Sequence, residues 1–181
     1  MKALFKQYQP VVRFLLLFFG SYAVLSLFYG LYLHFSSDGK PDPITQWVAT
    51  QSESVIESFG YASQVVANEG HPSMQLWVEG TLVGRIIEGC NALSIVILFA
   101  SFIIAFAEGF KKTLLFLFAG AVIIYGVNLL RIAVLAIALY RYPSYQEVLH
   151  TVVFPALIYG MVFLLWVLWI RSLNSIKEKN A

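Results

Sequence analysis

The chain has 181 residues, of which 59% are hydrophobic and only 12% are charged, and its formal net charge is +2. This composition lies far outside that of soluble globular domains and predicts an all-α integral membrane protein, with one membrane domain over residues 1–181. The small net charge averages a basic side and an acidic side of the protein, so it does not indicate a protein that binds nucleic acid.

Four apolar runs are long enough to cross a hydrocarbon core of about 30 Å as helices. They cover residues 11–35, 91–107, 113–140 and 151–170. The second run is at the short end of the workable range and predicts a nearly upright helix, whereas the third is long enough to tilt or to project beyond the lipid. The first run is longer than the apolar region of a cleavable secretory signal, so we expect it to be retained as a span.

Lysines and arginines set the expected orientation. They gather before the first span, in the turn between the second and third spans, and after the fourth: Lys2, Lys6, Arg13, Lys111, Lys112, Arg171, Lys177 and Lys179. Because basic residues mark the cytoplasmic side, both termini are expected in the cytoplasm, with the chain integral to the cytoplasmic (inner) membrane. Most of the charged residues in segment 36–89 are acidic, and this segment is then expected on the outer, periplasmic face.

The outer segment divides into parts by composition. Residues 36–43 read as a polar linker, and the spacing of apolar residues over 44–67 predicts one or two short amphipathic helices on the membrane. Such a helix can cover the spans or contact a substrate. Residues 74–78 and 81–87 flank Glu79-Gly80 and predict a β-hairpin with a two-residue turn.

The single cysteine, Cys90, stands at the outer end of the second predicted span. A lone thiol forms no internal disulfide and runs no dithiol relay, which argues against a disulfide oxidoreductase. At a helix N-terminus, with Asn91 or Ser94 as a cap, backbone N–H groups favour an anion, and the thiolate is the nucleophilic form of cysteine. The histidines show no metal-ligand spacing, so no metal and no cofactor are expected.

Two further polar groups are expected at the same membrane level as Cys90. Arg131 follows the start of the third span at Thr113 by eighteen positions, roughly 27 Å at the rise of a helix, which places it near the outer boundary. His150 begins the fourth span from outside. Asn128 precedes Arg131 by one helical turn and can orient either the guanidinium or a substrate.

Each of these groups also has a purely structural interpretation. Cys90 can be a small apolar filler, Arg131 can extend its side chain to the interface, and His150 can be an interfacial residue without a partner. His34, at the outer end of the first span, is a rival for any role as a base. An arginine between two apolar runs is costly in lipid, however, and by default indicates function.

Together these residues resemble a known family. The segment 88–92, Glu-Gly-Cys-Asn-Ala, the segment 128–131, Asn-Leu-Leu-Arg, and His150 are similar to the cysteine, Asn-x-x-Arg and histidine motifs of the exosortase/archaeosortase family. The resemblance covers roughly residue 88 to the end of the fourth span. This chain has Ala92 where the family often has glycine, and its four expected spans suggest a small exosortase-like variant.

The resemblance implies a membrane-embedded cysteine protease or transpeptidase. Its partner is expected to be a secreted protein whose C-terminal sorting signal consists of a short motif, a transmembrane helix and a basic tail. The expected catalytic residues are Cys90 as nucleophile, Arg131 as oxyanion stabiliser and His150 as general acid and base, with Asn128, Asn91 and Glu88 in support. Water and an amine remain open as the acceptor of the acyl group.

A non-enzymatic membrane scaffold or a partner subunit of an export complex is the alternative. In that case Arg131 and Asn128 pair with polar groups of another protein's helix, because buried polar side chains also hold helices together in lipid.

Overall fold

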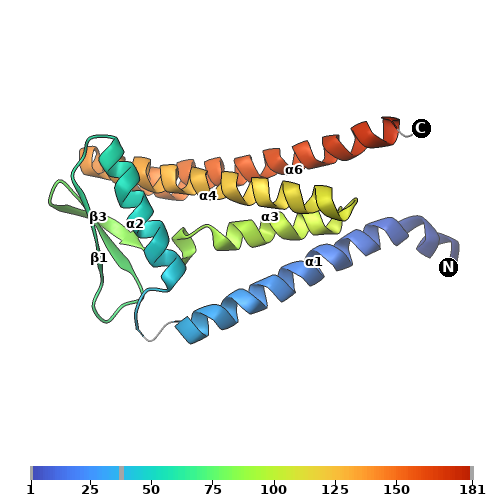
Figure 1. Cartoon of the computed structure of the whole chain (residues 1–181), viewed down its shortest axis with the longest axis horizontal. Coiled ribbons are helices and arrows are strands. Elements are labelled where there is room, and N and C mark those ends of the chain that lie inside the picture. The colour runs from blue at the N-terminus through green and yellow to red at the C-terminus, as the bar shows by residue number, and fades with distance from the viewer. Residues whose placement is uncertain (1, 37–38, 180–181) are drawn as a thin grey trace.

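The computed structural model describes residues 2–36 and 39–179, and the side chains of residues 8–36, 39–149 and 151–173. Four helices form an elongated bundle: α1 (Lys2–Ser36), α3 (Leu93–Ala105), α4 (Phe110–Arg141) and α6 (Phe154–Lys179). Both chain ends lie at one end of the bundle, and helix α2 (Pro43–Ser58) lies with a small sheet at the other (Figure 1).

The expectation of a mostly helical membrane protein is confirmed. Three helical segments are long and apolar enough to cross a membrane: Tyr8–Ser36, Phe110–Arg141 and Pro143–Leu173. Helix α3 has only 13 residues, about 20 Å of helix, so the predicted count of four full spans is not confirmed. Its sequence is strongly apolar, but Ala92 before it and Phe106 after it leave the helical conformation.

Helix α3 is held by a core inside the bundle. Phe99 and Ile103 of α3 are fully buried with Ile124 of α4 and with Val162 and Trp169 of α6. An added Cβ at Gly120 of α4 would overlap the ring of Phe99, so the small residue lets α3 and α4 approach closely.

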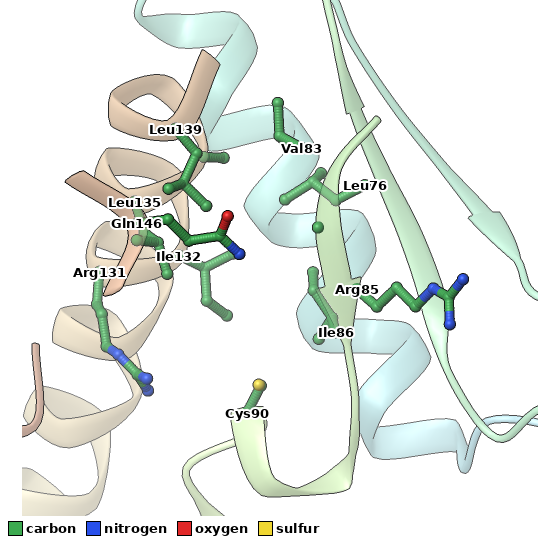
Figure 2. A pocket seen from close by; sticks show the side chains of 12 residues that line it. Leu76, Val83, Arg85, Ile86, Cys90, Arg131, Ile132, Leu135, Leu139 and Gln146 are labelled. Atoms are coloured by element: carbon green, nitrogen blue, oxygen red, sulfur yellow. The ribbon is translucent and has the colours of Figure 1, made fainter. Parts of the chain in front are cut away.

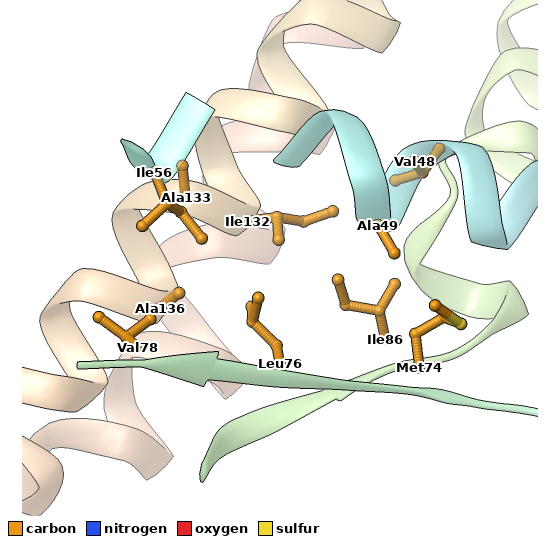
Figure 3. Close-up of a cluster of buried hydrophobic side chains, with 10 residues drawn as sticks. All are labelled: Val48, Ala49, Ile56, Met74, Leu76, Val78, Ile86, Ile132, Ala133 and Ala136. Atoms are coloured by element: carbon orange, nitrogen blue, oxygen red, sulfur yellow. The ribbon is translucent and has the colours of Figure 1, made fainter. Parts of the chain in front are cut away.

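A second core joins the bundle to the outer segment. It contains buried side chains of α2, of strands β2 (Met74–Val78) and β3 (Thr81–Ile86), and of the last turns of α4, as Figure 3 shows: Val48, Ala49, Ile56, Met74, Leu76, Val78, Ile86, Ile132, Ala133 and Ala136. The predicted extra length of the third span is therefore used to support the outer sheet.

Helix α2 begins as the sequence predicts. Asp42 is its N-cap and accepts from the backbone N–H groups of Ile44 and Thr45, each at 3.1 Å, while Pro43 occupies the first turn. The buried residues of α2 share one face, which confirms an amphipathic helix over the first part of residues 44–67.

The last part of that predicted helix is wrong, because residues 63–67 form strand β1 (Ser63–Ala67). Gly60 has a φ of +85°, which ends the helical region after Phe59. The following chain then pairs antiparallel with β2, from Ser63 opposite Val78 to Ala67 opposite Met74. The stabilisation of this ladder comes from pairing with the next strand along the chain, which the spacing of apolar residues over 44–67 does not show.

The predicted β-hairpin is confirmed. Glu79 and Gly80 have φ values of +50° and +73°, the signs that a type I′ turn requires at both central positions. The Glu79 carboxylate accepts from the N–H of Ala62 at 2.8 Å, which offsets the cost of a left-handed conformation in a residue with a side chain. The sheet order is β1-β2-β3, so β3 is an edge strand.

Candidate functional site

Cys90 lies in a short connection between the outer sheet and helix α3. Strand β3 leads into a 3-10 turn, η1 (Glu88–Cys90), in which the N–H of Cys90 donates to the carbonyl of Ile87 at 2.8 Å. Ala92 then has a φ of +64°, a conformation that glycine adopts at no steric cost. This gives a physical reason for a glycine at the same place in resembling sequences. The Cys90 side chain is half-buried.

Asn128 connects Cys90 to Arg131. Its Nδ2 donates to the carbonyl oxygen of Cys90 at 2.7 Å, and its Oδ1 accepts from Nη1 of Arg131 at 3.4 Å. The Asn128 side chain is 1% exposed. A single buried amide therefore fixes the turn that carries the thiol and one arm of the guanidinium.

The guanidinium of Arg131 faces the same space as the thiol. Figure 2 shows the Arg131 guanidinium extending from α4 toward the side of Cys90, whose sulfur points into the same cavity. The Nε of Arg131 is buried and has no hydrogen-bond partner in the part of the chain that the structure describes. Among the described residues no acidic side chain lines this cavity, so the Arg131 cation is available to stabilise negative charge that develops beside the sulfur.

Asn91 anchors the other side of the turn. Its Oδ1 accepts from the N–H of Leu93 at 2.9 Å, and its Nδ2 donates to Tyr29 at 3.0 Å and to Thr45 at 3.3 Å. The Tyr29 hydroxyl in turn lies 3.4 Å from the Glu88 carbonyl, to which it donates. Helices α1 and α2 thus both hold the cysteine turn. Sequence reasoning missed Tyr29 and Thr45, because nothing in the local sequence relates them to Cys90.

The cavity between α4 and the sheet has a volume of about 140 Å³. Its wall is largely aliphatic, with Leu76, Val83, Ile86, Ile132, Leu135 and Leu139 around it. The amide of Gln146, on the short helix α5 (Gln146–Val148), also reaches it (Figure 2). Gln146 was not expected from the sequence, although its place four residues before His150 is a usable clue.

The remaining predicted site residues lie as follows. His150 is in a π-helical turn, η3 (Leu149–Val153), just before α6, and its side chain lies outside the described residues, so its approach to Cys90 stays a prediction. Glu88 contributes its backbone carbonyl, and the residue itself is exposed. The ring of His34 lies 5.5 Å from that of Phe35, and His34 does not line the cavity.

Metal binding has no support among the described residues, where no group of three or more histidine, cysteine or acidic side chains could hold an ion. Among the described side chains, the site offers the thiol of Cys90, the guanidinium of Arg131 and the amides of Asn128 and Gln146. Arg85 also lines the cavity, but its side chain is directed away from it (Figure 2). A thiol beside a fixed cation is suited to nucleophilic attack on a carbonyl, with charge stabilisation of the oxyanion.

Comparison with known proteins gives two matches. Residues 9–171 match the family model described as Transmembrane exosortase (Exosortase_EpsH). Over 98 residues the chain is 33% identical to a protein named Archaeosortase A from Haloferax volcanii. That alignment covers 52% of this chain and 32% of the archaeal protein, so the chain matches well under half of its relative's length. No solved structure matches the chain.

Proposed function

Because this chain belongs to the exosortase/archaeosortase family, we propose that it cleaves the C-terminal sorting signal of secreted proteins through a thioester on Cys90. The observation that carries the proposal is the convergence of the Cys90 sulfur and the Arg131 guanidinium on one cavity, held by Asn128 between them. The substrate is a protein with a short motif, a transmembrane helix and a basic tail.

The reaction begins when His150 takes the proton of the Cys90 thiol and the sulfur attacks the scissile carbonyl carbon. A C–S bond forms, and the negative charge on the carbonyl oxygen is stabilised by Arg131. When the tetrahedral intermediate collapses, the C–N bond breaks and His150 delivers a proton to the leaving amine. Water or an amine then attacks the thioester and releases the thiolate of Cys90.

Several contacts of the described residues support this division of roles. Asn128 and Asn91 hold the two ends of the cysteine turn, so they act as positioning residues rather than as reacting groups. The carbonyl of Glu88 serves the same purpose through Tyr29.

The membrane arrangement also supports the proposal. The two termini and the turn from α3 into α4 lie toward one end of the bundle, and the sheet and α2 lie at the other (Figure 1). Lys111 and Lys112 stand in the first turn of α4, and Cys90 follows strand β3 in the chain. By the positive-inside rule the basic end is cytoplasmic, so we place the chain in the cytoplasmic membrane with its site facing outward.

The scaffold alternative is weaker on one specific observation. A scaffold that uses Asn128 and Arg131 to bind a partner helix needs them on an outer face of the bundle. Asn128 is instead buried and satisfied inside the chain, and Arg131 faces the cavity.

The experiment that tests the proposal follows the size of a tail-bearing protein encoded near this chain, in cells that carry the parent protein, Cys90→Ala or Cys90→Ser. Ser101→Ala, in helix α3 and away from the cavity, is the matched control. We expect processing with the parent and the control and none with the Cys90 variants. If the Cys90→Ala variant is present in the membrane and processing is unchanged, the scaffold interpretation would replace the proposed cleavage.

A further inference from the structure

The cavity beside Cys90 has the size and the wall of a side-chain subsite. Its volume of about 140 Å³ is close to the roughly 150 Å³ of an apolar cavity that binds benzene. Aliphatic side chains of β2, β3 and α4 face one another across it, and Cys90 with Arg131 lies at one end (Figure 2). The occupant that fits is one apolar side chain about as large as leucine or phenylalanine.

Gly84 determines how much of this space is open. It pairs with Leu76, whose side chain is buried, so both residues face the inner side of the sheet. Apart from its two chain neighbours, no residue has a heavy atom within 4 Å of a Cβ built on Gly84, and Gly84 lines the cavity. A glycine inside a strand weakens the strand and often marks a place where a ligand approaches closely.

A register shift next to Gly84 accompanies this arrangement. Leu76 is paired with Gly84 and Trp77 with Leu82, so Val83 is the extra residue of a bulge. Bulges are common beside active sites because they redirect side chains. Val83 lines the cavity together with Gly84.

The edge of β3 favours a peptide as the source of that side chain. β3 pairs with β2 on one side only, and its chain reaches the Cys90 turn within a few residues. An extended peptide can add to such an edge through its backbone and place alternate side chains in one pocket. A sorting motif just before a transmembrane helix is a segment of this kind.

The direction of the cavity indicates which part of the peptide enters it. From Arg131 the wall continues along α4 through Leu135 to Leu139, away from the end of the bundle that holds both termini. A substrate helix beside the spans lies toward that other end. The residue that enters the cavity is therefore on the N-terminal side of the cleaved bond.

We infer that this cavity is the subsite for one apolar side chain on the N-terminal side of the scissile bond, and that Gly84 sets the size it accepts. The inference rests on the proposed function of the same site. A larger residue at position 84 excludes the apolar side chain of the substrate from the cavity and leaves Cys90, Arg131 and Asn128 unchanged.

The test pairs variants of the protein with variants of its substrate. Gly84→Ala, Gly84→Val and Gly84→Leu are compared with Leu82→Phe, which adds bulk to the same strand on its exposed outer face. Each is assayed on a set of tail-bearing substrates in which the residues before the cleaved bond are changed one at a time to alanine. Gel filtration in detergent establishes that each variant is folded.

For the native substrate we expect the processing rate to fall progressively from Gly84→Ala to Gly84→Val to Gly84→Leu. At the two larger residues the rate should be about 10- to 200-fold below that of the parent protein. One alanine substrate should be processed poorly by the parent and best by Gly84→Val, an inversion of preference. Leu82→Phe should keep the parent preference. An inversion at a single substrate position cannot result from general damage to the fold.

Two results would overturn the inference while leaving the proposed function intact. One is an unchanged preference across all substrates in the Gly84 series. The other is an equal loss of rate on every substrate, the result expected if a lipid chain fills the cavity. Processing by Cys90→Ala, by contrast, would remove the proposed function and the inference with it.

Discussion

Replacing Asn128 should separate the thiol turn from the cation that faces it. In Asn128→Leu the side chain keeps the same branching and number of heavy atoms, so no cavity forms, but both of its hydrogen bonds are lost. The carbonyl of Cys90 loses its 2.7 Å donor, and Nη1 of Arg131 loses a 3.4 Å acceptor. The result is a site in which the reacting groups are present and no longer held.

The loss of stability in Asn128→Leu can be estimated from these two hydrogen bonds. An acceptor left without a partner away from water costs about 1–3 kcal/mol, and the longer contact to the guanidinium adds about 1 kcal/mol. The free energy of unfolding should therefore fall by about 2–4 kcal/mol. If the same contacts operate in the transition state, processing slows by roughly 30- to 900-fold, at about 1.36 kcal/mol per factor of ten.

Asn128→Asp distinguishes the two contacts. The carboxylate keeps an acceptor for Arg131 but places an oxygen against the Cys90 carbonyl, which needs a donor. If the hold on the cysteine turn is what matters, Asp and Leu should slow processing to a similar extent.

The assay is the in-cell processing rate together with thermal unfolding in detergent. Tyr125→Phe is the matched control, because it removes a 2.9 Å hydrogen bond from the same helix to Gln51, outside the cavity, and should change processing little. Parent-like processing and unfolding of Asn128→Leu would refute the reasoning.

Four further substitutions test other contacts. Arg131→Lys keeps the charge but not the planar fork, so processing should fall about 10-fold or more with little change in thermal unfolding, and a parent-like rate would argue against oxyanion stabilisation. Gly120→Ala should lower the free energy of unfolding by about 1–3 kcal/mol, because its methyl group meets Phe99. Gly126→Ala in the same helix has no atom near it and should raise that free energy by up to about 1 kcal/mol, so equal effects of the two alanines would contradict the packing argument. Thr113→Val should raise it by about 1 kcal/mol, since the buried Oγ1 has no partner in the described part of the chain, and a loss of stability on thermal unfolding would reveal a missed contact.

Much of the fold is readable from local pattern. The long apolar runs predict α1, α4 and α6, since apolar length alone decides whether a helix can remain in lipid. The change from the polar linker 36–43 to the apolar spacing that starts at residue 44 predicts where α2 begins, and Glu79-Gly80 predicts the turn between β2 and β3. Helix α3 is shorter than its apolar run because the ends of that run are needed for the cysteine turn and for the turn into α4.

The candidate site is partly readable for a different reason. Cys90 and Arg131 could be assigned to one membrane level because span length and rise per residue fix depth. Depth does not fix the rotation of a helix about its own axis, which decides whether a side chain faces lipid, a neighbouring helix or a cavity. The hydrogen bonds of Asn128 settle that question for α4.

The sequence by itself therefore determined the membrane class of this protein, the level at which its polar groups lie and the family that its motifs resemble, because these follow from composition and spacing along one chain. Only the tertiary structure decided that β1 is a strand, that Tyr29 and Thr45 hold the cysteine turn, and that Gly84 lines a cavity beside Cys90. Each of these depends on which residue of another element lies opposite, and the spacing of residues within one element carries no record of that partner.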